Sequence, residues 1–349
     1  MKICVVGAGA IGGFMAVRLE QAGHTVSVVA RGPHLAVIKA HGLKLIEAEQ
    51  EQVATDAIRE LDTQDVVLLG LKAHQVEPVV DDLPALIGPN TVMVTLQNGI
   101  PWWYFQKLGG DYADRVVTTV DPRGVLFDRI DPDCLIGCIA YPAATIAEPG
   151  VIRHIEGNRF PVGELNGSKS DRVQRVSDLF AEGGFKSRVL DDIRSEIWLK
   201  LWGNLTFNPI SALTHSTLVD IFQFPPTREL AVAMMGEAQA VGEKLGARFR
   251  VPMEKRIAGA EGVGKHKTSM LQDLEAGKPM EIEGMLGVVI ELAEMTKIEV
   301  PTLRSLYACV SLLDRAVRDR GFVSGARQCS DQPWPVPVRD AWLVKLKGG

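Results

Sequence analysis

The chain has 349 residues, of which 46% are hydrophobic and 23% are charged, and its formal net charge is −5. A chain of this length can bury a sizeable core, and the usual size of a domain predicts two units. The acidic balance gives no basic footprint for nucleic acid or an anionic membrane surface, and no uncharged apolar run is long enough to span a bilayer. The composition therefore favours a soluble protein without nucleic-acid or membrane partners.

The five cysteines, at positions 4, 134, 138, 309 and 329, follow no paired spacing. Cys134 and Cys138 are close in sequence, but no histidine or cysteine pair at zinc-binding spacing accompanies them. We therefore expect no metal ion. Because no disulfide framework is visible, a reducing cytoplasm is the simplest setting.

The chain begins with MKICVVGAGAIGG, in which residues 3–6 predict a buried strand. A G-x-G-x-x-G pattern follows and opens a helical pattern over residues 13–22, and a second strand pattern covers residues 25–30. This order is typical of a dinucleotide-binding loop, whose glycines allow a tight turn, close approach of the backbone to pyrophosphate and close packing of the helix on the strand. The predicted cofactor-binding residues of this loop are Gly7, Ala8, Gly9, Ala10, Ile11 and Gly12.

The second strand ends at Ala30 and Arg31, where an NAD enzyme usually has a carboxylate that binds the ribose 2′-hydroxyl. An arginine can instead bind a 2′-phosphate through charge-assisted hydrogen bonds, whereas a carboxylate would repel it. The sequence therefore predicts NADP(H) as the cofactor. The alternative is that Arg31 is a solvated loop residue.

Residues up to about 190 alternate between strand and helix patterns. Strand patterns cover residues 66–71, 91–99, 116–120, 135–140, 152–163 and 186–190, and helical patterns cover 76–86 and 171–183. From residue 191 the pattern is helical, over residues 192–207, 227–246, 252–276, 280–296 and 301–319. We therefore predict an α/β domain over residues 1–190, a helical domain over 191–320 and an irregular, proline-containing tail over 321–349.

Two polar residues stand where predicted strands end. Lys72 follows the strand over 66–71, and Asn98 closes the strand over 91–99. Open parallel sheets bind ligands outside the carboxyl ends of their strands, so both residues are candidates for binding. Asn98-Gly99 is also an ordinary turn dipeptide, and Lys72 could simply be the polar end of a buried strand.

The helix predicted over residues 192–207 carries a polar stripe. Lys200, Asn204 and Asn208 are four residues apart, so they share one face of a helix that also carries Trp198 and Trp202. Buried ammonium and amide groups are costly unless they are hydrogen-bonded, so this stripe predicts a polar ligand. The alternative is a lysine that extends past Trp198 to solvent, with the two amides exposed.

Five segments together resemble the ketopantoate reductase (2-dehydropantoate 2-reductase) family over residues 1 to about 315. They are GAGAIGG with Arg31, LKAHQ, TLQNGI, EIWLKLWGNLTFNPISAL and TSMLQDLEAGKPMEIEGMLG. The resemblance implies a Rossmann-type domain followed by an all-α domain like the C-terminal domain of 6-phosphogluconate dehydrogenase. It also implies the NADPH-dependent reduction of 2-dehydropantoate to pantoate, on the pantothenate route to coenzyme A.

The resemblance further implies roles for single residues. Lys200 matches the general acid, and Glu281 matches a second catalytic residue that supports substrate binding and orientation. Lys72 matches a residue near the cofactor, and Asn98 contacts both ligands. The residues that would hold the hydroxyl and carboxylate of the substrate are Asn98, Asn204, Asn208 and Ser269.

The chemistry of the reaction agrees with these roles. Hydride delivery to a ketone leaves negative charge on its oxygen, so a cationic donor such as Lys200 would lower the barrier. For Glu281 the alternative is a carboxylate placed by the helix dipole in the first turn of a helix over 280–296. For Ser269 the alternative is a capping box with Gln272.

The sequence departs from the family pattern at two places. Thr217 and Leu218 stand where family members often have another substrate-binding asparagine, and Trp102-Trp103 follow the Asn98 loop, at the expected mouth of the site. Both departures would suit a larger 2-keto acid. The departures therefore leave an NADPH-dependent reductase of another 2-keto acid as an alternative. A second alternative is an NADPH-binding sensor without enzymatic activity, which would need the glycine-rich loop and Arg31 but neither Lys200 nor Glu281. The long C-terminal helices and the tail are a candidate interface for a homodimer.

Overall fold

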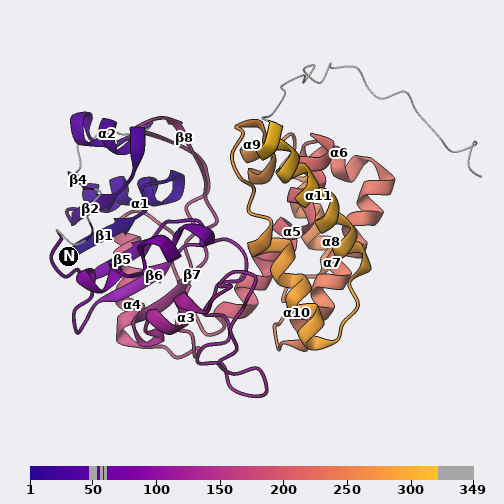
Figure 1. Cartoon of the computed structure of the whole chain (residues 1–349), viewed down its shortest axis with the longest axis horizontal. Helices are drawn as coiled ribbons and strands as arrows, with labels where there is room; N and C mark the ends of the chain where they lie inside the picture. The colour runs from indigo at the N-terminus through magenta and orange to yellow at the C-terminus, as the bar shows by residue number, and fades with distance from the viewer. Residues whose placement is uncertain (47–52, 56–57, 59–60, 321–349) are drawn as a thin grey trace, which may run out of the picture.

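The computed structural model describes residues 1–46, 53–55, 58 and 61–320, so the predicted tail over 321–349 lies outside the described residues. Figure 1 shows two lobes side by side, an α/β lobe formed by the N-terminal half and a lobe of helices formed by the C-terminal half. The N-terminal α/β lobe and the helical C-terminal region confirm the predicted fold class. Within the described residues, none of the helices is long and apolar enough to cross a membrane.

An eight-stranded, mainly parallel sheet forms the centre of the first lobe as far as the structure describes it, with the strand order β11-β10-β7-β6-β5-β1-β2-β4. Strands β10 and β11 run antiparallel to the other strands described in this sheet, since β10 pairs antiparallel with β7 and parallel with β11. In chain order the strands are β1 (Lys2–Val6), β2 (Thr25–Val29), β4 (Val53–Thr55), β5 (Val66–Leu69), β6 (Val92–Thr95), β7 (Leu135–Cys138), β10 (Val162–Gly163) and β11 (Val189–Leu190).

The strands form because both faces of the sheet are covered. Every residue of β5, β6 and β7 is buried, as expected for continuous apolar, β-branched runs in a parallel sheet. The helices α1 (Ala10–Gln21) and α4 (Asp171–Glu182) pack on one face. Helix α2 (Gly32–His41) follows β2, and a small sheet of order β3-β9-β8 packs beside α1; it contains β3 (Lys44–Leu45), β8 (Ala143–Glu148) and β9 (Val151–Glu156).

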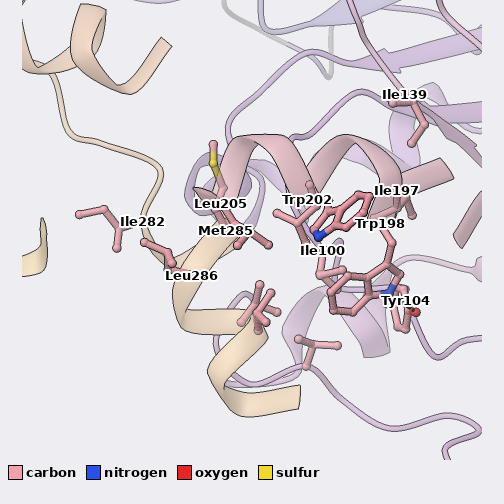
Figure 2. Packing of buried hydrophobic residues seen from close by; sticks show 14 of the residues in the cluster. Ile100, Tyr104, Ile139, Ile197, Trp198, Trp202, Leu205, Ile282, Met285 and Leu286 are labelled. Atoms are coloured by element: carbon pink, nitrogen blue, oxygen red, sulfur yellow. Dashed lines mark hydrogen bonds between the residues drawn. The ribbon is translucent and has the colours of Figure 1, made fainter. Parts of the chain in front are cut away.

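The other face of the sheet meets the long helix α5 (Ile193–Thr214), which begins directly after β11. Trp198 and Trp202 lie in this core beside Ile100 and Tyr104 (Figure 2). The indole nitrogen of Trp198 donates to the Tyr104 hydroxyl at 2.8 Å, and that of Trp202 donates to the Met235 carbonyl at 2.7 Å. The tryptophans therefore fix the rotation of α5 about its axis, which decides where its polar stripe points.

The remaining helices pack around α5, with α7, α9 and α11 in direct contact with it. They are α6 (Leu218–Gln223), α7 (Pro225–Lys244), α8 (Met253–Glu261), α9 (Ser269–Glu275), the π-helical turn η6 (Glu283–Gly287), α10 (Val288–Thr296) and α11 (Pro301–Arg320). In the first lobe, α3 (Val125–Arg129) is a single short helix, and η5 (Pro132–Cys134) leads into β7.

Several predicted elements of the first lobe are wrong. The helix expected over 76–86 is a series of short turns, η2 (Ala73–Gln75), η3 (Glu77–Val79) and η4 (Leu83–Leu86), because Pro78 and Pro84 interrupt a continuous helix. The strand expected over 116–120 is a loop whose amides at Thr118 and Thr119 donate to Glu291. The strand expected over 152–163 divides into β9 and β10 at Gly157, which has a φ of +76°.

Three helices of the second lobe differ from their predicted bounds. The helix expected over 252–276 breaks into α8 and α9, because glycines at 262 and 264 end α8 and Thr268 caps α9. The helix expected over 192–207 continues through Pro209 to Thr214. The helix expected over 280–296 starts at Glu283 as a π-helical turn, so Glu281 precedes it rather than lying in its first turn.

Candidate functional site

The glycine-rich loop between β1 and α1 has the geometry that a pyrophosphate needs. Gly7 has a φ of +103°, and a Cβ there would lie 2.9 Å from the backbone of Gly70, the residue that directly follows β5. A Cβ on Gly12 would overlap the Gly7 carbonyl oxygen, so only glycine fits at either position. A Cβ on Gly9 would meet nothing closer than 4.0 Å, which leaves the outer side of the loop open.

Helix α1 begins at Ala10 with Gly9 as its N-cap, and no side chain caps its first amides. Those amides and the positive end of the helix dipole form a ready site for phosphate. Ala8 is buried under the loop, whereas Ala10 and Ile11 are half-buried at its surface. The residues present therefore fit a dinucleotide.

Arg31 is exposed at the N-cap of α2, directly after β2. Its side chain has no hydrogen bond or ion pair to any residue that the structure describes, so it is free to pair with an anion. In the same turn of α2, His34 Nε2 lies 2.7 Å from the Ala8 carbonyl oxygen. The arginine is thus held on the same side as the glycine-rich loop, as a residue that binds a 2′-phosphate would need to be.

The side chain of Lys200 extends from α5 to the carboxyl edge of the sheet. Its Nζ donates to the Asn98 side-chain oxygen at 2.5 Å and to the Ala140 carbonyl oxygen. Lys200 therefore does not extend past Trp198 into solvent, and the alternative of a solvent-exposed polar stripe on α5 is wrong. The Ala140 carbonyl is a partner that the sequence did not indicate, because a backbone oxygen has no residue-type signature.

Burial lowers the pKa of Lys200 to about 8, while the Glu281 carboxylate and the Cys138 thiol act in the opposite direction. Desolvation disfavours the charged form of an amine, whereas nearby negative charge favours it. A lysine with this pKa is still mostly protonated at neutral pH. It can therefore donate a proton more readily than an ordinary lysine.

Asn98 connects the two residues to which the sequence assigns catalytic roles. Its amide nitrogen donates to a Glu281 carboxylate oxygen at 3.4 Å, while its amide oxygen accepts from Lys200. The turn after Asn98 requires glycine, because Gly99 has a φ of +84° and a Cβ there would overlap the Gly284 carbonyl oxygen. Asn98-Gly99 is therefore both a turn dipeptide and part of the polar cluster.

The C-terminal part of the polar stripe on α5, at Asn204 and Asn208, lies against α9. Asn208, which is 5% exposed, donates to the Ser269 hydroxyl at 3.4 Å, and Asn204 is half-buried without a side-chain hydrogen bond to a described residue. The cap of α9 is Thr268, whose hydroxyl accepts from the Leu271 amide, so the alternative for Ser269, a capping box with Gln272, is wrong. Asn204 and Ser269 thus keep hydrogen-bonding capacity for a ligand.

Lys72 lies at the sheet edge but its ammonium group faces the second lobe. Its Nζ donates to an Asp273 carboxylate oxygen at 2.8 Å and to the Pro279 carbonyl oxygen at 3.4 Å. Asp273 belongs to the TSMLQD segment, which carries part of the family resemblance. The sequence did not indicate that Asp273 pairs with Lys72. Lys72 therefore forms a bridge between the lobes within reach of the sheet edge where the cofactor is expected.

The expected placement of Trp102-Trp103 at the mouth of the site is wrong. Both are only 2% exposed, and the Trp103 indole donates to the Thr95 hydroxyl at 3.1 Å, because the chain turns inward after Gly99. Thr217 caps α6 through Asp220, and Leu218 is buried. The tryptophans therefore cannot act as walls that select a larger substrate.

The chain matches known proteins along most of its length. Residues 3–167 match the family described as ketopantoate reductase PanE/ApbA, and residues 192–314 match its C-terminal family. A 2-dehydropantoate 2-reductase from Mesorhizobium japonicum is 50% identical over 329 residues, which is 93% of this chain and 100% of that protein.

Solved structures are also similar to this chain over most of its length. A structure from Ralstonia solanacearum, assigned to the ketopantoate reductases, has a TM-score of 0.86 and 35% identity, covering 92% of this chain and 99% of that one. D-mandelate dehydrogenase with NADH and anilino(oxo)acetate has a TM-score of 0.79 at 20% identity, covering 91% and 100%, a likeness that shows the fold alone. The family matches and the close relative show that the chain belongs to the ketopantoate reductase family.

Proposed function

We propose that the protein reduces the ketone of 2-dehydropantoate to the alcohol of pantoate with NADPH. The observation that carries this proposal is the hydrogen-bonded cluster at the sheet edge, in which Lys200 Nζ donates to the Asn98 side-chain oxygen at 2.5 Å and the Asn98 amide nitrogen donates to Glu281 at 3.4 Å. Burial lowers the pKa of this lysine to about 8, which suits a proton donor. NADPH, held by the glycine-rich loop and Arg31, would supply the hydride. The 2-dehydropantoate 2-reductase of M. japonicum, at 50% identity, supports the same substrate.

In this proposal each side chain of the Lys200, Asn98 and Glu281 cluster has a separate role. Lys200 donates a proton to the ketone oxygen as negative charge develops there, because its ammonium lies at the sheet edge beside Asn98. Asn98 holds Lys200 Nζ in place through its amide oxygen. Glu281 keeps the lysine protonated and accepts a hydrogen bond from the substrate, since a carboxylate accepts and does not donate. The amides of Asn204 and Asn208 and the Ser269 hydroxyl contact the rest of the substrate.

The deciding experiment is the consumption of NADPH, followed at 340 nm, with 2-dehydropantoate and with a panel of other 2-keto acids. We expect 2-dehydropantoate to have the highest kcat/KM. Lys200→Ala should lower turnover by roughly 10²–10⁴-fold, the usual contribution of a general acid. Lys244→Ala, an exposed lysine at the end of α7, is the matched control and should leave turnover unchanged.

The panel also tests the second candidate function, a reductase of another 2-keto acid, which is favoured by Thr217 and Leu218 in place of a further substrate-binding asparagine. A higher kcat/KM with another 2-keto acid would establish it. Binding of NADPH without turnover of any acid would establish a sensor instead.

We further propose that the chain divides into two domains, over residues 1–190 and 191–320. Strand β11 ends at Leu190 and α5 begins at Ile193, which supports a domain boundary there.

We also propose that the protein is located in the cytoplasm and forms a homodimer. The four cysteines in the described part of the chain are unpaired, which supports a reducing compartment. Sedimentation velocity at micromolar concentration tests the dimer, and limited proteolysis near residue 191 tests the boundary.

A further inference from the structure

Glu196 is a buried carboxylate that the proposed reaction does not use. It stands one turn before Lys200 on α5, so the two side chains share one face of the helix. Glu196 is only 8% exposed, and it accepts a hydrogen bond from the Tyr141 hydroxyl at 2.8 Å. Side-chain nitrogens of Arg159 and Arg188 each lie 3.6 Å from its carboxylate oxygens. The helix that carries Lys200 therefore also carries a second buried charge, with partners of its own.

The N-terminus of α5 does not explain the burial of Glu196. A carboxylate in the first turn of a helix interacts favourably with the helix dipole, but it does so from an exposed position as well. Asp192 already caps this helix, since its side chain accepts from the Ser195 amide at 3.0 Å. Withdrawing a carboxylate from water is costly unless charged and hydrogen-bonded partners replace the water. The partners of Glu196 therefore point to a role that requires its buried position.

Tyr141 connects Glu196 to Lys200 through the backbone. It directly follows Ala140, whose carbonyl oxygen accepts from Lys200 Nζ. The residues on both sides of Ala140 donate their backbone amides to the chain over residues 159–161, at 3.0 and 3.1 Å. Alternate residues of an antiparallel pair face opposite edges, so the Ala140 carbonyl faces away from that chain and toward α5. The direction of this carbonyl thus depends on how Tyr141 is held.

Three contacts hold the side chain of Tyr141. Its hydroxyl donates to Glu196, the guanidinium carbon of Arg159 lies 4.0 Å from its ring centre, and Lys200 Nζ lies 6.0 Å from the same centre. Both cations are within the usual range of a cation–π interaction. Burial and the Glu196 carboxylate raise the pKa of Tyr141, whereas Arg159 acts in the opposite direction. The hydroxyl therefore stays protonated and donates to Glu196 at neutral pH.

We propose that Glu196 and Tyr141 are positioning residues, whose hydrogen bond holds the Ala140 carbonyl against Lys200 Nζ. The contacts form a closed ring that starts at Glu196, passes through Tyr141 and Ala140 to the lysine, and returns along one turn of α5. Because the ring joins α5 to the chain that leaves β7, it fixes the ammonium group relative to the sheet edge where the ketone is expected. This inference rests on the proposed function, in which Lys200 protonates the ketone.

The first variant, Tyr141→Phe, keeps the ring and removes the hydroxyl. We expect kcat for 2-dehydropantoate to fall by roughly 5–20-fold, within the worth of a hydrogen bond to a charged group, while KM for both substrates stays close to the parent values. Tyr112→Phe is the matched control. Tyr112 also has an arginine near its ring, Arg115 at 5.7 Å, but its hydroxyl donates to no carboxylate among the residues that the structure describes. The control should leave kcat unchanged.

Glu196→Gln and Glu196→Ala separate the hydrogen bond from the charge. The glutamine side-chain oxygen still accepts from Tyr141, so Glu196→Gln should retain most of kcat, whereas Glu196→Ala should lose about as much as Tyr141→Phe. Since one interaction is removed in either case, Tyr141→Phe should cost little further in the Glu196→Ala background. Additive losses would show that the two side chains act independently and would overturn the proposal.

The rate at which acetic anhydride acetylates Lys200, followed by mass spectrometry across pH, reports the state of the lysine without turnover. In Tyr141→Phe and Glu196→Ala the ammonium loses an oriented acceptor. The pKa of Lys200 should therefore fall below about 8, and acetylation should begin at lower pH. The side chains whose charges act on this pKa are Glu281 and Cys138, and neither is altered in these variants. A shift would thus report the loss of the carbonyl contact.

Lys244, which is exposed at the end of α7, is the internal reference in each sample and should not change. A shifted Lys200 profile supports the positioning role even if the parent reduces no 2-keto acid, in which case the proposed function alone fails. Turnover by the parent, with kcat and the Lys200 profile unchanged in both variants, refutes the positioning role and leaves the function standing, whether or not the thermal midpoint falls. No turnover together with an unchanged profile refutes both.

Discussion

At the scale of single residues, the lowered pKa of Lys200 has a direct kinetic consequence. The lysine must be protonated to act as an acid, so kcat/KM for ketone reduction should be constant below about pH 7 and should fall tenfold per unit above the pKa of about 8. A pH profile measured with saturating NADPH checks this. A rate that remained level up to pH 10 would show that Lys200 does not supply the proton.

Glu281 is expected to act on this profile as well as on the substrate. Its carboxylate favours the protonated form of Lys200, so Glu281→Gln should move the falling limb to lower pH and should raise KM for the 2-oxo acid. NADPH affinity and the thermal midpoint should stay near the parent values. Unaltered kinetics with a large fall in thermal midpoint would instead indicate a purely structural carboxylate.

Arg31 is expected to decide between the two nicotinamide cofactors. Its exposed guanidinium at the start of α2 can pair with a 2′-phosphate that NADH lacks. Arg31→Ala should therefore reduce the preference for NADPH over NADH by about 1.5–3 kcal/mol. Kd values for both cofactors, from fluorescence titration, give this difference. Equal affinities in the unmodified protein would exclude the pairing.

At the scale of elements, the turn after β6 is held by a contact between the lobes. The Ile100 amide donates to the Gly284 carbonyl at 3.1 Å, and Gly99 leaves no room for a side chain. Gly99→Ala should therefore destabilise the protein by more than about 1 kcal/mol and lower turnover, because Asn98 would move away from Lys200.

Gly110→Ala is the matched control for that variant. Gly110 has a φ of +86°, close to that of Gly99, but an added Cβ would meet nothing within 4 Å. The control therefore carries the strain of the backbone without the overlap. Equal losses of thermal midpoint in the two variants would show that the contact with Gly284 does not matter.

At the scale of the whole molecule, Glu291 of α10 fastens the loop over residues 117–120 to the helical lobe. Its carboxylate accepts from the Thr118 amide and hydroxyl at 2.8 Å each and from the Thr119 amide at 2.7 Å. Glu291→Ala should lower the free energy of unfolding by about 1–2 kcal/mol, since part of this contact is exposed. Urea unfolding checks this against Glu294→Ala, an exposed neighbour paired with Arg304, which should change little.

Much of the architecture could be predicted from the sequence because it depends on local rules. The glycine-rich loop, the buried strands and the change from alternating to helical patterns each leave a periodic or compositional signature, and the fold class they predict is confirmed. The polar stripe of α5 was visible for the same reason, since residues four apart must share a face. The roles of Lys200 and Glu281 stay predictions until kinetics tests them.

Other features depended on tertiary contacts that no local pattern encodes. The loop at Thr118 is apolar and β-branched like a strand, but its amides bind Glu291, which lies far along the chain. Trp102 and Trp103 are buried because the chain turns inward at Gly99. The sequence by itself thus determined the family, the cofactor loop and the face of α5. Only the packing of the lobes decided which backbone oxygen holds Lys200, because Ala140 and Lys200 are distant in sequence.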